Sequence, residues 1–100
     1  MTEYQIVVER PAAREADAAA NWYEDERPGL GQEFLAELSA TYHRILSGPL
    51  GYQVRRSDTR RAQLRRFPYA VFFAVEGNVI IVTAVLHVRR DPQEWQRRRD

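Results

Sequence analysis

The chain contains no cysteine and no lysine. Without cysteine there can be no disulfide, no thiolate nucleophile and no sulfur-ligated zinc. No stretch approaches the roughly 18 consecutive apolar residues that a membrane-spanning helix needs. The first residues lack the basic opening and the apolar stretch of a signal peptide. We therefore expect a cytoplasmic protein that does not associate with a membrane.

Charge is divided unevenly along the chain. Residues 1–50 hold nine acids and four bases, a net charge of −5, whereas residues 51–100 hold eleven bases and five acids, a net charge of +6. All fifteen basic residues are arginine, whose planar guanidinium suits phosphates, carboxylates and aromatic rings. A GC-rich genome would explain the choice of arginine over lysine, but it would not explain the clustering. The second half is therefore a candidate surface for nucleic acid or an acidic protein.

The length of 100 residues, with 44% hydrophobic and 29% charged residues, fits one folded domain over residues 1–100. An apolar, β-branched run at residues 4–8 predicts a strand, and Pro11 begins a helix. This helix carries a stripe of small apolar side chains that suits close packing against a neighbour. The stripe consists of Ala12, Ala16, Ala19, Ala20 and Tyr23.

Turn-forming residues at 27–31 separate this helix from a second amphipathic one, so the two should form a helical hairpin. The second helix should end at residues 47–49, with Gly48 in the left-handed cap conformation and Pro49 preventing continuation. Its apolar positions are Phe34, Leu35, Leu38, Tyr42, Ile45 and Leu46.

From residue 60 the apolar period becomes that of strands, after an irregular stretch at 50–59. Strands are predicted at 60–67, 69–75 and 79–88, forming an antiparallel meander with a glycine-containing hairpin turn at 76–78. The last strand is apolar on both faces, as expected of a central strand. The sequence thus predicts an α+β fold with the element order β-α-α-β-β-β.

Arginines cluster in two places in this second half. Alternation along 60–67 should place Arg61, Gln63 and Arg65 on one face and Ala62, Leu64 and Arg66 on the other. Such a basic row either protects an edge strand from aggregation or contacts an acidic partner or phosphates. The second cluster, Arg89 and Arg90, ends the last strand beside His87, where Asp91 can pair with one of them. The closing run Arg97 to Arg99 is expected to be a solvated tail.

The sequence gives little support for metal, nucleophilic-serine or nucleotide sites. His43 and His87, the only histidines, do not have metal-ligand spacing, so we expect no metal site. No nucleophilic-serine, phosphate-loop or dinucleotide motif is present, and no cofactor is expected.

Four segments, in their order along the chain, resemble members of the RelE/ParE toxin superfamily. They are Ala18 to Tyr23, Pro28 to Phe34, Leu64 to Tyr69, and Val85 to Pro92 with Trp95 behind it. The resemblance covers nearly the whole chain. It implies an N-terminal helical hairpin packed on a small, mainly antiparallel sheet. It also implies a bacterial type II toxin that forms a hetero-oligomer with a cognate antitoxin, which wraps and neutralises it.

Two activities occur in this superfamily. The RelE-like branch cleaves messenger RNA on the ribosome with basic side chains on the sheet and usually a late tyrosine, whereas the ParE-like branch is no nuclease and poisons DNA gyrase. Here Ala70 stands where the resemblance would place a catalytic arginine, and no tyrosine follows residue 90. We therefore favour gyrase inhibition, a function without catalysis. A ribosome-dependent nuclease and a divergent member that binds only its antitoxin are the alternatives.

The candidate site residues follow from both clusters. Residues expected to bind the antitoxin or the target are Arg61, Arg65, Arg66, His87, Arg89, Arg90 and Trp95. If the protein is a nuclease instead, the candidates for catalysis are His87, Arg65, Arg90 and Glu94.

Overall fold

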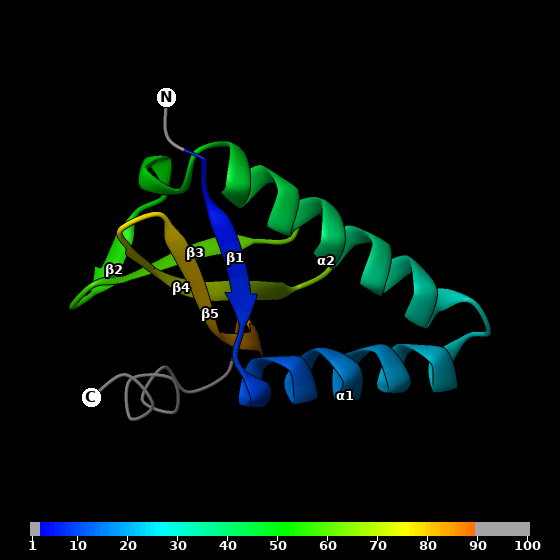
Figure 1. Cartoon of the computed structure of the whole chain (residues 1–100). Helices are drawn as coiled ribbons and strands as arrows, with labels where there is room; N and C mark the ends of the chain where they lie inside the picture. The colour runs from blue at the N-terminus through cyan, green and yellow to red at the C-terminus, as the bar shows by residue number, and fades with distance from the viewer. Residues whose placement is uncertain (1–2, 90–100) are drawn as a thin grey trace.

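The structure, a computed structural model, describes residues 3–89 and consists of two helices packed against a five-stranded sheet (Figure 1). The sheet order is β1-β5-β4-β3-β2, with β1 parallel to β5 and every other pair antiparallel. The predicted helical hairpin on a mainly antiparallel sheet is confirmed. In chain order the elements are β1 (Gln5–Val8), α1 (Arg10–Glu26), α2 (Leu30–Ser47), the 3₁₀ helix η1 (Pro49–Gly51), β2 (Val54–Arg56), β3 (Thr59–Gln63), β4 (Tyr69–Glu76) and β5 (Val79–His87).

The first strand pairs with the last one. The parallel register runs from Gln5 opposite Val79 to Val8 opposite Val82, and β1 and β5 lie side by side in Figure 1. The Glu9 amide then donates to the Val82 carbonyl at 2.9 Å, after which the chain turns into α1. Beyond Val82, β5 therefore continues without β1 beside it.

The alanine stripe of α1 is buried as predicted: Ala12, Ala16, Ala19 and Ala20 are all at most 7% exposed. Small side chains let α2 approach closely, and Gly31 marks the contact. A Cβ added to Gly31 would lie 2.6 Å from the Ala20 carbonyl oxygen, closer than any side chain tolerates.

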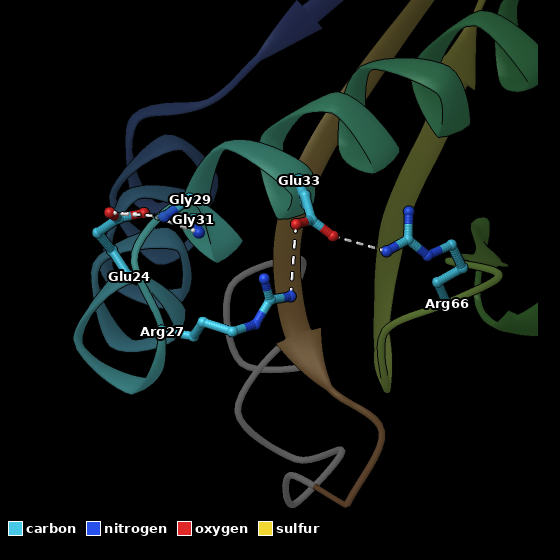
Figure 2. Close-up of polar contacts among 6 residues, drawn as sticks. All are labelled: Glu24, Arg27, Gly29, Gly31, Glu33 and Arg66. Atoms are coloured by element: carbon cyan, nitrogen blue, oxygen red, sulfur yellow. Dashed lines mark hydrogen bonds and ion pairs between the residues drawn. The ribbon is translucent and has the colours of Figure 1, made fainter.

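The start of α2 is held by a carboxylate from α1. Gly29, in the left-handed conformation with φ of 89°, is the N-cap residue and has no side chain to cap the helix. Glu24 supplies the acceptors instead, because its two oxygens accept the amide hydrogens of Gly29 at 2.9 Å and Gly31 at 3.0 Å (Figure 2). Free amides at a helix start need such partners, so this contact fixes the hairpin.

An aromatic cluster joins the helices to the sheet. Phe34 of α2 is fully buried, and its ring centroid lies 5.4 Å from that of Tyr23, 5.3 Å from that of Phe67 and 5.2 Å from that of Tyr69. The first of these rings belongs to α1 and the other two to the segment that enters β4. Phe34 thus connects the segments that will form the candidate site.

The central strands are buried on both faces, as the apolar run at 79–86 predicted. Ala70, Phe72, Ala84 and Leu86 form a second buried cluster, separate from the core under the helices. Between these strands the register shifts, with Phe72 opposite Ala84 but Phe73 opposite Val82. Thr83 is therefore the extra residue of a β-bulge.

Two expectations for the middle of the chain were wrong. The stretch 50–59 contains a strand, β2, in which all three residues are exposed, so that no apolar pattern reveals it. Arg60 holds this region by donating to the carbonyls of Leu50 at 3.2 Å and Tyr52 at 2.6 Å. Strand β3 ends at Gln63 rather than at residue 67, because the Leu64 amide bonds the Tyr69 carbonyl at 2.9 Å and closes a turn.

Two details of α2 also differ from expectation. Gly48 has φ of −173°, which is extended rather than left-handed. The turn into Pro49 is instead closed by the Gly48 amide, which bonds the Ile45 carbonyl at 3.1 Å. Leu35, expected on the apolar face, is 42% exposed because it lies at the margin of that face.

Candidate functional site at the strand ends

Two regions that the sequence singled out meet at one end of the sheet. Tyr69, the first residue of β4, pairs with His87, the last residue of β5. The Val88 amide also donates to the Pro68 carbonyl at 2.9 Å. The turn that carries Arg65 and Arg66 therefore lies beside the exit of β5. We call this surface the strand-end site; it comprises Arg65, Arg66, Pro68, Tyr69, His87 and Arg89, with Trp22 and Tyr23 of α1.

Arg66 is held over the helical hairpin by an acid of α2. Its Nη2 lies 2.9 Å from Glu33 Oε1, and the other oxygen of Glu33 is 3.4 Å from Arg27 (Figure 2). The hydrogen bond from Arg66, and then the charge of Arg27, hold the pKa of the Glu33 carboxyl below its ordinary value. Alternation had placed Arg66 with the buried residues of its strand, but it is exposed because β3 ends before it. Its charge is partly offset by Glu33.

Arg65 presents its charge outward. Its backbone amide donates to Glu37 Oε2 at 3.0 Å, which fixes the turn and leaves the exposed guanidinium out of the bond. Among residues 3–89, no acid forms an ion pair with that guanidinium. Arg65 is therefore a cation available to a partner.

Arg61 lies away from the strand-end site. It sits within β3 opposite Phe72, so its side chain belongs to the face that bears the second buried cluster. Partial burial, and then the nearby charge of Arg55, lower the pKa of the Arg61 guanidinium. The predicted continuous row of Arg61, Gln63 and Arg65 does not form, because Arg65 lies in the turn beyond the strand.

His87 and Arg89 form the exit of β5. The Arg89 amide donates to His87 Nδ1 at 3.1 Å, and the imidazole meets the Tyr69 ring edge-on at a centroid distance of 5.4 Å. Because Nδ1 accepts a hydrogen bond, the neutral imidazole carries its proton on Nε2. Arg89 itself is exposed. His43, by contrast, lies on the exposed surface of α2, where its Nδ1 is 2.9 Å from the Ser39 carbonyl oxygen.

The remaining predicted site residues lie outside the residues that the structure describes. These are Arg90, Glu94 and Trp95, together with Asp91 and the closing arginines.

An aromatic pocket completes the site, and the sequence did not predict it. A cavity of about 370 Å³ is lined by Trp22, Tyr23, Pro68, Tyr69 and His87. Trp22 is 57% exposed, although tryptophan carries a large apolar ring. Burial, and then the neighbouring Tyr69, raise the pKa of the Tyr23 hydroxyl. The sequence did contain a signal for this pocket. Trp22 is a large apolar residue of the first helix that does not belong to the buried alanine stripe.

Two other kinds of site are absent from residues 3–89. No three acidic or histidine side chains converge there in a way that could hold a metal ion. Neither helix is long and apolar enough to cross a membrane.

The sequence matches one family model over most of its length. The model is that of the ParE toxin of the type II toxin–antitoxin system parDE, and the match covers residues 6–92. No curated protein is similar enough in sequence to match the chain.

Two solved structures share the fold. A chain of the chromosomal ParDE toxin–antitoxin system from P. aeruginosa superposes with a TM-score of 0.75 at 19% identity, covering 85% of this chain and 96% of that one. A chain of the toxin–antitoxin complex RelBE2 from Mycobacterium tuberculosis superposes with a TM-score of 0.58 at 16% identity, covering 86% of this chain and 99% of that one.

Proposed function

The chain belongs to the ParE toxin family of type II toxin–antitoxin systems, and on that premise we propose that it inhibits DNA gyrase when free and is neutralised by a cognate antitoxin. The observation that carries this proposal is the make-up of the strand-end site. Within residues 3–89 it offers exposed arginines and aromatic rings, which bind, but no pair of groups arranged for proton transfer. Such a surface favours inhibition by binding over catalysis.

The chemistry of RNA cleavage supports the same choice. Cleavage needs a base at the 2′-hydroxyl and an acid at the leaving oxygen, each within hydrogen-bond reach. At the strand-end site the one imidazole, that of His87, uses Nδ1 to accept the Arg89 amide hydrogen. Ala70, at the position expected for a catalytic arginine, is fully buried within the sheet. This leaves His87 Nε2 for proton transfer, and a nuclease would need a second acid or base beside it.

An antitoxin partner is supported by charge and by the related complexes. Arg65 and Arg89 are exposed, and the two solved structures described above come from toxin–antitoxin systems. Exposed guanidiniums beside aromatic rings suit an acidic segment, since arginine and aromatic residues dominate protein interfaces. We propose a hetero-oligomer in which that segment covers the strand-end site.

Two parallel assays test the proposed target. Purified protein is added to a gyrase supercoiling reaction and to a translating extract, with the heat-denatured protein as a control in each. We expect loss of supercoiling with intact messenger RNA. Cleavage of the message in phase with codons, with unaffected gyrase, would instead establish a ribosome-dependent nuclease. If neither reaction responds, a member that only binds its antitoxin becomes the better description.

A further inference from the structure

We propose that the aromatic pocket of the strand-end site receives one bulky apolar side chain from an acidic segment of the antitoxin. The inference rests on the proposed function, because it assumes that an antitoxin exists. It adds the point of attachment and the chemistry that the antitoxin must bring.

The pocket has the size and lining of an anchor site. Its volume of about 370 Å³ is enclosed by Trp22, Tyr23, Tyr69, His87 and Pro68, and small-molecule and side-chain sites are typically apolar hollows of this kind with few polar groups. Trp22 is 57% exposed to water. Residues that dominate binding energy are most often tryptophan, tyrosine and arginine. Tryptophan and tyrosine line this pocket, and Arg89 follows two residues after His87.

The orientation of the rings favours a side chain over a nucleic acid base. Trp22 and Tyr23 meet edge-on at 85°, and Tyr69 and His87 meet edge-on at 75°. The wall rings that contact one another therefore meet edge to face, and none of these contacts is a parallel stack of the kind that bases form with aromatic side chains. Rings set at right angles form a rounded socket instead, which suits leucine, isoleucine or phenylalanine.

Charges around the pocket give the bound segment a direction. The side formed by the strand ends carries Arg65 and Arg89, both exposed. The side formed by α1 carries Asp25 and Glu26, which follow Trp22 by about one helical turn. A segment crossing the pocket should therefore place its carboxylates toward the strand ends. The same acids would repel the phosphates of a nucleic acid.

His87 adds one defined hydrogen-bond donor. With Nδ1 occupied by the Arg89 amide at 3.1 Å, the neutral ring has its proton on Nε2. An oxygen next to the anchoring side chain, either a backbone carbonyl or a carboxylate, is the matching acceptor. The pocket thus selects an apolar anchor with an oxygen beside it.

The test measures binding to the protein encoded by the reading frame adjacent to this gene, by titration calorimetry. We expect Trp22→Ala to weaken binding on the order of tenfold to thirtyfold, the loss typical of an interface anchor. Trp22→Phe should keep most of the affinity, because it retains an aromatic wall. The control is Leu35→Ala, which removes an apolar side chain of α2 that is 42% exposed and lies outside the pocket; it should bind like the unmodified chain. Circular dichroism verifies that all variants fold.

The outcomes separate the two proposals. If the unmodified chain binds the neighbouring protein and Trp22→Ala binds equally well, the anchor site is wrong although the toxin–antitoxin pairing stands. If the unmodified chain does not bind it, the proposed pairing fails and the anchor fails with it.

The Trp22 indole N–H resonance, assigned by its loss in Trp22→Phe, supplies a second measurement. A shift caused by a single-stranded RNA oligonucleotide, and not by the neighbouring protein, would overturn the inference in favour of a base-binding pocket.

Discussion

The carboxylate of Glu15 on α1 accepts the amide hydrogen of Val85 on β5 at 3.0 Å. The parallel pairing with β1 ends at Val82, so strand β1 offers no acceptor to the amide of Val85. A helix side chain takes the place of the missing strand. The bond ties α1 to β5 just before the exit of that strand, and so it helps to position the strand-end site.

We predict that Glu15→Ala lowers the free energy of unfolding by about 1–3 kcal/mol, the cost of a buried amide left without an acceptor. Glu15→Gln should lose less, because its amide oxygen can still accept. Urea unfolding followed by circular dichroism measures both. Asp17→Ala, an exposed acid on the same helix, is the control for charge. Equal stability of Glu15→Ala and the unmodified chain would show that the bond contributes nothing.

Gly31→Ala should destabilise the helical hairpin. The new methyl would lie 2.6 Å from the backbone oxygen of Ala20, so the helices must separate, at a cost of about 1–3 kcal/mol. The matched control is Gly51→Ala, whose added Cβ meets no atom within 4 Å. Thermal unfolding should show a lower Tm for Gly31→Ala alone. A similar Tm in both variants would mean that the hairpin yields without cost.

Arg66→Ala should raise the pKa of the Glu33 carboxyl, and by more than Arg27→Ala does. The hydrogen bond from Arg66 is the main cause of the lowered pKa, and the charge of Arg27 is a lesser one. Carbon-13 chemical shifts of the Glu33 carboxyl, followed against pH, report each pKa. The opposite ranking would assign the main interaction to Arg27.

The sign of the linked pH effect follows from the direction of that shift. Because the folded-state pKa lies below the unfolded one, the contribution of Glu33 to stability is present above the unfolded pKa. It is lost as the pH falls through the folded pKa. Glu33 is exposed enough that solvent screens this contribution, so the titration is a sharper measurement than the unfolding midpoint.

Arg89→Ala should weaken gyrase inhibition roughly tenfold, if the strand-end site contacts the target through its exposed cations. The fold should be unchanged, because only the backbone amide of Arg89 takes part in the bond to His87. Arg14→Ala, which removes an exposed arginine of α1 that is not among the residues of the strand-end site, controls for net charge. Full inhibition by Arg89→Ala would remove this residue from the target surface. We expect the same effect for Arg90→Ala. Arg90 lies outside the residues that the structure describes.

Local patterns in the sequence predicted the helices and the antiparallel meander. The alanine stripe and the apolar positions of α2 repeat at helical spacing, and the run at 79–86 reads as a buried strand. Strand β2 could not be predicted because its three exposed residues carry no apolar period. The parallel pairing of β1 was not predicted either, since a partner far along the chain leaves no mark in a local pattern.

The candidate site was predicted in part, for the same reason. The residues around Arg65 and His87 stand out individually as charged or titratable groups. Their meeting with Trp22 depends on three segments that are joined only by tertiary packing around Phe34 and Tyr69. Arg61 and Arg65, predicted to share a strand face, are separated by a turn that the bond from the Leu64 amide to the Tyr69 carbonyl closes.

The pairing of β1 with β5 has a consequence for biosynthesis. Strand β1, the first to leave the ribosome, cannot pair with β5 until that strand, the last within residues 3–89, has been translated. Such distant contacts form slowly because a long loop must first be closed. A chain truncated before β5 would lack the partner of β1 and two residues of the strand-end site, His87 and Arg89. Interrupted translation should therefore release fragments that cannot fold. Only full-length chains should need neutralisation by an antitoxin.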